Sequence, residues 1–113
     1  MMSHLSPIKT RIHEPALLRE TLDELGFPCD THERVLTNDE HDEGMVVELS
    51  VRLAEGDVVG FRRHADGTYS ICADWSRVER DTGIRMQDFV RRVNARYAHV
   101  VFDHLASCWA EAT

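Results

Sequence analysis

The feature that most constrains the fold is a run of strict alternation in the middle of the chain. Every second side chain between residues 45 and 53 is apolar, and Glu48, Ser50 and Arg52 stand between them. A period of two is typical of an antiparallel strand with one buried face and one wet face. We predict one strand over 45–53 whose apolar side chains lie on the same side: Met45, Val47, Leu49, Val51 and Leu53.

Two further strands are predicted directly after this one. Turn sequences at Glu55-Gly56 and Ala65-Asp66-Gly67 bound the alternating segments 58–63 and 69–75. Gly67 can adopt the positive φ of a tight hairpin, such as a type I′ turn at Asp66-Gly67. Three consecutive strands joined by two short turns form a meander.

The first part of the chain shows weaker patterns. Residues 5–12 alternate, and Pro7 favours either an edge strand or an irregular entry into the strand. Residues 32–37 are compatible with a short strand. The polar run 38–44 holds four carboxylates and no apolar stripe, so we expect a mobile loop.

Two segments show helical spacing instead. The first covers residues 15–25, with a proline in its first turn and Gly26 as a stop. The second covers residues 85–109, after a cap at Asp81 or Thr82. At a rise of ~1.5 Å per residue it is about 37 Å long, enough to cross a whole sheet. Its apolar positions are Met86, Phe89, Val90, Val93, Tyr97, Val100, Val101, Leu105 and Cys108.

These elements predict an α+β fold in a single domain, residues 1–113. A chain of 113 residues is too short to close two separate cores. Two helices on one face of a mainly antiparallel sheet of four to five strands is the simplest arrangement, in the order β-α-β-β-β-β-α.

Charge and composition exclude several classes of protein. The formal net charge of −7 opposes sequence-independent binding to nucleic acid, which clustered cations drive. No apolar run approaches the ~20 residues that a membrane span needs, and the first four residues resemble no export signal. We therefore expect a cytoplasmic protein with reduced thiols at Cys29, Cys72 and Cys108. No glycine-rich phosphate loop or close cysteine pair is present, so no cofactor is predicted.

Six segments resemble a known family and follow its order. They are residues 2–10, Leu22-Asp23-Glu24-Leu25-Gly26-Phe27, Val59-Gly60-Phe61, Asp66-Gly67-Thr68-Tyr69, Ala73-Asp74-Trp75 and Arg96-Tyr97-Ala98. The family is the conserved hypothetical chloroplast open-reading-frame-thirty-five family of plastids, cyanobacteria and other bacteria. The resemblance implies an accessory subunit, because bacterial members tend to be encoded near an AAA-type ATPase and a ferredoxin-like protein. This sequence departs from the family at Ser76, where a second aromatic residue often follows Trp75.

Two patches are candidates for binding a ligand or partner. In the first, which begins at Asp66, Asp74 could hydrogen-bond a ligand and Trp75 could offer an apolar plate; the alternative is a turn and a core residue. The second combines the amino-terminal His4 and Lys9 with three arginines of the long helix. Two of these arginines share a helical face and could form a cationic ridge that docks a partner. The alternative is that they are simply the solvent-exposed side of an amphipathic helix. The arginines are Arg91, Arg92 and Arg96, of which Arg92 and Arg96 share the face.

Metal binding has weaker support in the sequence. His99 and Asp103 are four residues apart on the predicted helix, and His104 is adjacent. A second set could converge at the acidic run 38–44: His32, Asp39, His41 and Asp42. Neither set has a diagnostic spacing, so solvated surfaces are the simpler interpretation.

The leading functional prediction is a small accessory protein that acts by protein–protein interaction, without a catalytic centre. The alternative is a ligand-binding or catalytic domain with a pocket between the sheet and the long helix. That pocket would use His4, Lys9, Asp74 and Tyr97. The first hypothesis predicts an exposed apolar patch, whereas the second predicts converging polar groups.

Overall fold

The computed structural model describes residues 5–38, 41–54 and 57–112 and has an α+β architecture. Its elements are β1 (Leu5–Lys9), α1 (Pro15–Glu24), β2 (Cys29–Asp30), β3 (Arg34–Asn38), β4 (His41–Val47), β5 (Leu49–Ala54), β6 (Asp57–Arg63), β7 (Tyr69–Asp74), α2 (Trp75–Thr82) and α3 (Met86–Ala112). Among the described residues, no helix is both long enough and apolar enough to cross a membrane.

Five strands form an antiparallel sheet in the order β1-β7-β6-β5-β2. The predicted meander is confirmed, because β5, β6 and β7 are neighbours in the sheet. The predicted edge position of the first strand is also confirmed, and it suits Pro7, which has no N–H to donate to a second neighbour. Strand β2 was not predicted; its two residues pair with β5.

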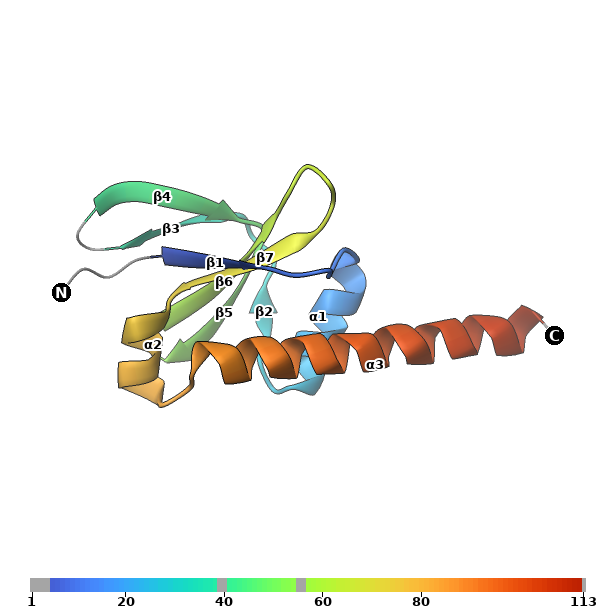
Figure 1. Cartoon of the computed structure of the whole chain (residues 1–113). Coiled ribbons are helices and arrows are strands. Elements are labelled where there is room, and N and C mark those ends of the chain that lie inside the picture. Colours follow the sequence, from blue (N-terminus) through green and yellow to red (C-terminus); the bar gives the residue numbers. More distant parts are fainter. Residues whose placement is uncertain (1–4, 39–40, 55–56, 113) are drawn as a thin grey trace.

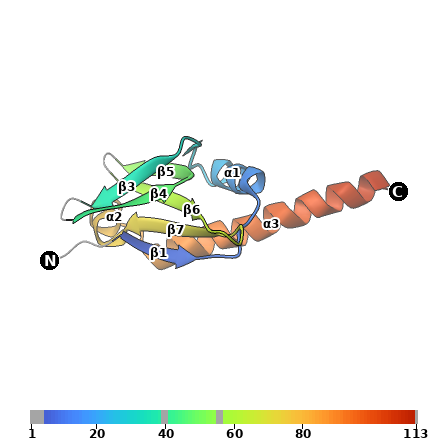
Figure 2. The ribbon, with the colours of Figure 1, turned by 90° about the horizontal axis from the view of Figure 1, so that it is seen from above.

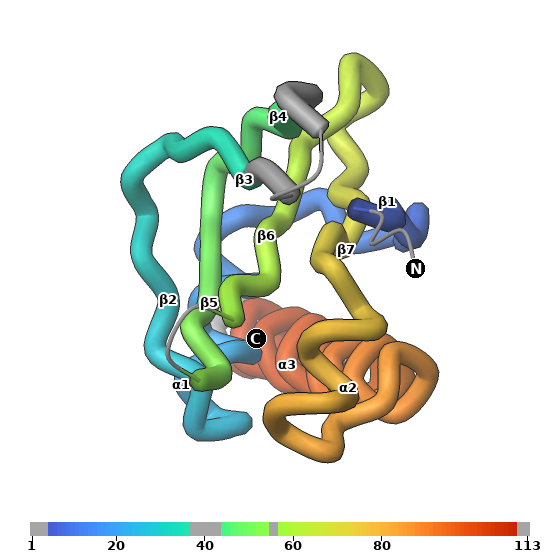
Figure 3. The backbone as a smooth tube through the Cα atoms, turned by 90° about the vertical axis from the view of Figure 1, so that its left-hand side faces the viewer, coloured from blue at the N-terminus to red at the C-terminus, as the bar shows by residue number. Residues whose placement is uncertain are grey.

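The sheet is covered on both faces (Figure 1). All three helices contribute to one continuous core against the sheet, where Phe61, Tyr69 and Ile71 are fully buried. The hairpin of β3 and β4 lies on the opposite face, so an end-on view shows hairpin, sheet and helices in succession (Figure 3). The prediction of only two helices and one sheet was therefore incomplete.

The hairpin sits very close to the sheet. Leu36 and Val47 of the hairpin form a small buried cluster with Cys72 of β7. Beneath them, Gly60 of β6 leaves the room they need. A Cβ there would lie 2.6 Å from Val47 Cγ1, 2.9 Å from Val47 Cβ and 2.7 Å from Leu36 Cδ1. The absence of a side chain at position 60 thus sets the spacing between the hairpin and the sheet.

The predicted single strand over 45–53 is in fact two strands, and this corrects the placement of its side chains. The backbone bends at Glu48, whose N–H donates to the Phe61 carbonyl at 2.9 Å and whose carboxylate accepts from the Tyr69 hydroxyl at 2.5 Å. Val47 therefore packs between the hairpin and the sheet, whereas Leu49 packs in the helix-side core. Apolar residues continue at every second position through the bend. Those before Glu48 face the hairpin cluster, whereas those after it face the helix-side core.

The polar run 38–44 was predicted as a loop, and this prediction was wrong for its ends. Residues 34–38 and 41–47 pair as the antiparallel strands β3 and β4, with Thr37 opposite Gly44. Only the tip, residues 39–40, lies outside the described residues. The hairpin is held by its own backbone pairing and by the apolar contacts that Leu36 and Val47 make with the sheet.

Helix α2 was missed by sequence reasoning. The Asp74 carboxylate caps it by accepting from the Arg77 N–H at 3.3 Å, and Gly83 ends it with a φ of 76°. Asp81 and Thr82 therefore lie at the end of α2 and do not cap the long helix. Only Trp75 and Val78 of α2 are buried, which is too few to reveal a helical period.

Helix α3 crosses the sheet with its first half and projects beyond it with its second half (Figures 1 and 2). Phe89, Val93 and Val100 are buried against the core, as the spacing predicts. The same spacing predicts burial of Leu105 and Cys108, and there it was wrong: both are exposed. The body of the protein ends before it reaches them.

Replacing Gly60 by alanine tests the close approach of the hairpin. Because the new methyl group would overlap Val47 and Leu36, we expect Gly60→Ala to lower the free energy of unfolding by about 1–3 kcal/mol. Urea unfolding followed by circular dichroism measures this change.

A double-mutant cycle with Val47→Ala is the control. Removing the Val47 methyl groups relieves part of the overlap, so the double variant should lose less stability than the sum of the single variants, by about 0.5 kcal/mol or more. Strict additivity would show that overlap with the Val47 methyl groups does not cause the loss.

Candidate functional site

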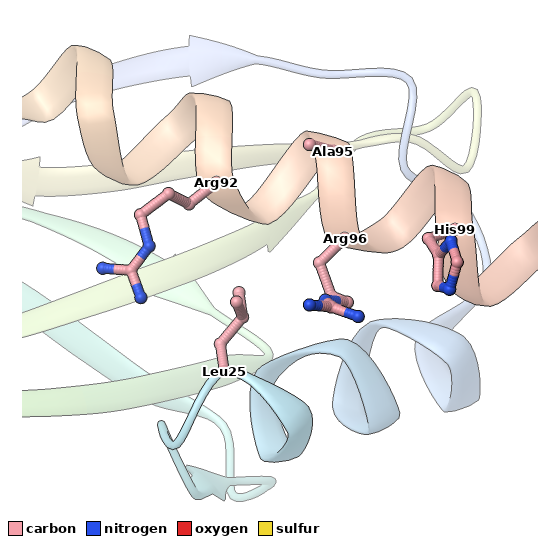
Figure 4. A pocket seen from close by; sticks show the side chains of 5 residues that line it. All are labelled: Leu25, Arg92, Ala95, Arg96 and His99. Atoms are coloured by element: carbon pink, nitrogen blue, oxygen red, sulfur yellow. The ribbon is translucent and has the colours of Figure 1, made fainter.

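A groove runs between the end of α1 and the middle of α3 (Figure 4). It encloses about 540 Å³. Arg96 and His99 of α3 point toward α1, Arg92 extends past the end of α1, and Leu25 rises between the two arginines. The lining residues are Leu25, Arg92, Ala95, Arg96 and His99.

Helical spacing places the basic groups together. Arg92, Arg96 and His99 are four and three residues apart, so they share one face of α3. The predicted shared face of Arg92 and Arg96 is therefore confirmed. Arg91, in contrast, forms an ion pair with Asp88 away from the groove.

Contacts with the end of α1 hold the two arginines over the groove. The Arg92 guanidinium carbon lies 5.6 Å from the centre of the Phe27 ring, a cation–π arrangement. Arg96 Nη1 lies 3.6 Å from Glu24 Oε1, and both side chains are about two-fifths exposed. An exposed pair of this kind contributes at most about 1 kcal/mol. A carboxylate from another molecule could therefore replace Glu24 at little cost.

Asp74 and Trp75 have structural contacts. Asp74 caps α2, as described above. Trp75 is 7% exposed, its indole N–H donates to the Ser6 carbonyl at 3.2 Å, and its ring centre lies 5.8 Å from that of Phe89. Trp75 therefore lies in the core, which was the alternative to an exposed apolar plate for a ligand.

Asp66 and Lys9, predicted in different patches, lie together on the surface. Lys9 Nζ is 3.5 Å from Asp66 Oδ2. The Thr68 hydroxyl and N–H donate to Asp66 Oδ1 and lower the pKa of Asp66 to about 2. The predicted type I′ turn is wrong, because it needs a positive φ at Asp66 and only glycines among the described residues have one. Gly67, with a φ of 88°, instead closes a turn in which its N–H donates to the His64 carbonyl at 2.9 Å.

The residues proposed for a pocket between sheet and helix do not converge where they are described. Lys9 and Asp74 lie at opposite ends of the β1–β7 ladder, and His4 lies outside the described residues. The Tyr97 hydroxyl accepts the N–H groups of His13 at 3.3 Å and Glu14 at 3.1 Å. A cavity of about 380 Å³ adjoins Tyr97, and its other lining residues are Arg11, Ile12, Asn94 and Ala98.

The candidate metal ligands on α3 lie in pairs. His99 Nε2 lies 3.4 Å from Asp103 Oδ2, and His104 Nε2 lies 3.9 Å from Cys108 Sγ. No group of three or more potential ligands gathers in the part of the chain that the structure describes. Asp39 of the acidic run lies outside that part.

Sequence reasoning missed a charged cluster where β6 meets α2. The Asp57 side chain is 1% exposed, and its Oδ1 lies 3.4 Å from Arg77 Nε; the same Nε lies 3.7 Å from Asp81 Oδ2. Burial, and then the neighbouring Asp81, raise the pKa of Asp57. Hydrogen bonding from Arg80 lowers the pKa of Asp81. Asp57 is far in sequence from Arg77 and Asp81, so no local motif could reveal the cluster.

Comparison with known families gives one match. Residues 21–107 match the family described as "Protein of unknown function (DUF1257)". The matched region includes the groove, the sheet except β1, and most of α3. No curated protein and no solved structure matches the chain.

Tyr97→Phe tests the link between α3 and the start of α1. The substitution keeps the ring but leaves two backbone N–H groups without their acceptor, so we expect a loss of about 1–2 kcal/mol in the free energy of unfolding. Thermal and urea unfolding measure it. Phe89→Leu, which changes packing without removing a hydrogen bond, provides a comparison for amide exchange. Only Tyr97→Phe should speed exchange at His13 and Glu14.

Asp57 and Asp66 should make the stability of the protein depend on pH in opposite directions. The pKa of buried Asp57 is raised, so its contribution is full below about pH 4 and is lost as pH rises through its folded pKa. The pKa of Asp66 is lowered to about 2, so its contribution is present above about pH 4 and is lost as pH falls towards 2.

Asparagine variants separate the two effects. Relative to wild type, Asp57→Asn should become progressively more stable as pH rises from about 4 to 8, whereas Asp66→Asn should show a constant deficit there that closes below about pH 4. Urea unfolding from about pH 2 to about pH 8 measures both. A stability profile of Asp57→Asn parallel to that of wild type would contradict the raised pKa.

Proposed function

This chain belongs to the DUF1257 family of proteins of unknown function, and we propose that it is an accessory protein that binds an acidic segment of another protein in the α1–α3 groove. The observation that carries the proposal is the juxtaposition of Arg92 and Arg96 over an apolar floor formed by Leu25.

The chemistry of the groove suits a peptide with carboxylates. A guanidinium group can hold a carboxylate through two parallel hydrogen bonds, which gives direction as well as charge. Leu25 offers apolar contact between the two arginines. In a chain with a net charge of −7, this cationic face also orients an acidic partner toward one surface.

The other predicted polar residues support binding over catalysis. Asp74 caps a helix, Tyr97 accepts two backbone N–H groups, and Asp66 stabilises a turn. Each of these groups is therefore engaged in holding the fold. A catalytic domain would need such groups to converge on a substrate.

The resemblance to the chloroplast open-reading-frame-thirty-five family narrows the partner. We propose an AAA-type ATPase or a ferredoxin-like protein, which in bacterial members are encoded nearby, and a shared cytoplasmic location. Of these two proteins, we expect the groove to bind the one that presents an exposed acidic segment.

Charge reversal in the groove tests the proposed function. We expect Arg96→Glu to weaken binding of the purified partner by about tenfold or more, because the groove would then repel its carboxylates. Arg91→Glu is the matched control, since it changes the net charge equally but lies outside the groove. Isothermal titration calorimetry at two salt concentrations measures both.

Comparison of the two variants distinguishes the effect of the groove from the effect of overall charge. Equal weakening by Arg91→Glu and Arg96→Glu would mean that overall charge, and not the groove, governs binding. Failure of the wild-type protein to bind either candidate would rule out both partners.

A further inference from the structure

The free end of α3 exposes an apolar stripe that the core does not use. Phe102 is 68% exposed, Leu105 is 55% exposed and Trp109 is 79% exposed. Together with Ala106, these side chains line a shallow apolar groove on the projecting half of the helix. Contiguous apolar surface of this kind marks an interaction site.

The stripe lies on the side of α3 that faces away from the body. At about 100° per residue, Phe102 and Trp109 are roughly 160–180° around the helix from Val93, which faces the core. The stripe is therefore a second surface and not a continuation of the buried one. Its members recur with alternating spacings of three and four, the seam of a coiled coil: Ala95, Ala98, Phe102, Leu105 and Trp109.

We propose that a second copy of this chain covers the stripe, with the two α3 helices antiparallel. In that alignment Ala98 of one copy faces Trp109 of the other, and Phe102 faces Leu105. Each layer then pairs a large side chain with a smaller one, and two-fold symmetry repeats both layers. The seam is thus complementary to itself in shape.

The area of the stripe is sufficient for a dimer. From their exposed fractions, the two aromatic side chains alone offer roughly 300 Å² per copy. Leu105 and three exposed alanines, Ala95, Ala98 and Ala106, add to this area. When all of it is covered, a symmetric pair buries about 1,000 Å², the lower limit for a specific interface. The proposed dimer is therefore reversible and dependent on concentration.

Charge also favours a second copy in this orientation. Between Ala98 and Trp109, the positions on either side of the seam are His99, Val101, Ala106 and Cys108. None of these is acidic, so no two carboxylates meet along the contact. A parallel pair would bring two bodies of charge −7 side by side, whereas the antiparallel pair places them at opposite ends.

Sedimentation of the full chain tests the dimer. Wild type should be dimeric at high concentration, and Phe102→Ala or Trp109→Ala should raise the dissociation constant about tenfold or more. Because both side chains are exposed, the monomer should stay folded by circular dichroism. Val35→Ala with Val46→Ala is the control, since these apolar residues are exposed on the outer face of the hairpin.

Cross-linking tests the orientation. The antiparallel alignment brings Val101 of one copy near Cys108 of the other. In a Cys29→Ser background, Val101→Cys should yield a cross-linked dimer with a short bis-maleimide, and adding Cys108→Ser should abolish it. Asp103→Cys carries the same number of thiols on another side of the helix and should give little dimer.

A wild-type protein that stays monomeric at high concentration would overturn the proposal, as would equal cross-linking of Val101→Cys and Asp103→Cys. Neither result bears on the groove, because Arg96→Glu is scored by binding of a different protein. The two proposals therefore stand or fall separately.

Discussion

The contact of Phe89, Val93 and Tyr97 with the sheet is the interaction on which both proposed surfaces depend. It fixes the rotation of α3 about its own axis. With that face buried, Arg92 and Arg96 line the groove at the end of α1, and Phe102 and Trp109 lie on the far side. A small rotation of α3 would remove the arginines from the end of α1. The apolar core therefore determines where the charges are displayed.

Local periodicity predicted the parts of the fold that depend on neighbouring residues. The meander and both predicted helices follow from spacing within short windows, and so does the shared face of Arg92 and Arg96. Spacing could not show that the backbone bends at Glu48, because alternation is unchanged on either side of a bend. Nor could it show where the body ends beneath α3, which depends on the length of other elements.

Contacts between distant segments account for the remaining misses. Asp57 and Asp81 meet only because α2 packs against the sheet, and α2 itself has two buried residues. The Tyr97 hydroxyl is an acceptor for the start of α1 because the first and last helices are adjacent in space. The candidate site followed the same pattern. Its arginines were predictable, whereas the apolar floor from Leu25 required the fold.

The positions of the two tryptophans give the protein a pair of separate natural probes. Trp75 is enclosed by the core and touches Phe89, while Trp109 stands in water near the tip of α3. The emission of the first depends on whether the core is assembled. The emission of the second depends on whether anything lies over the tip. Fluorescence quenchers dissolved in water will therefore reach Trp109 first, and shielding of that residue alone will report occupancy of the helix end in an otherwise unchanged molecule.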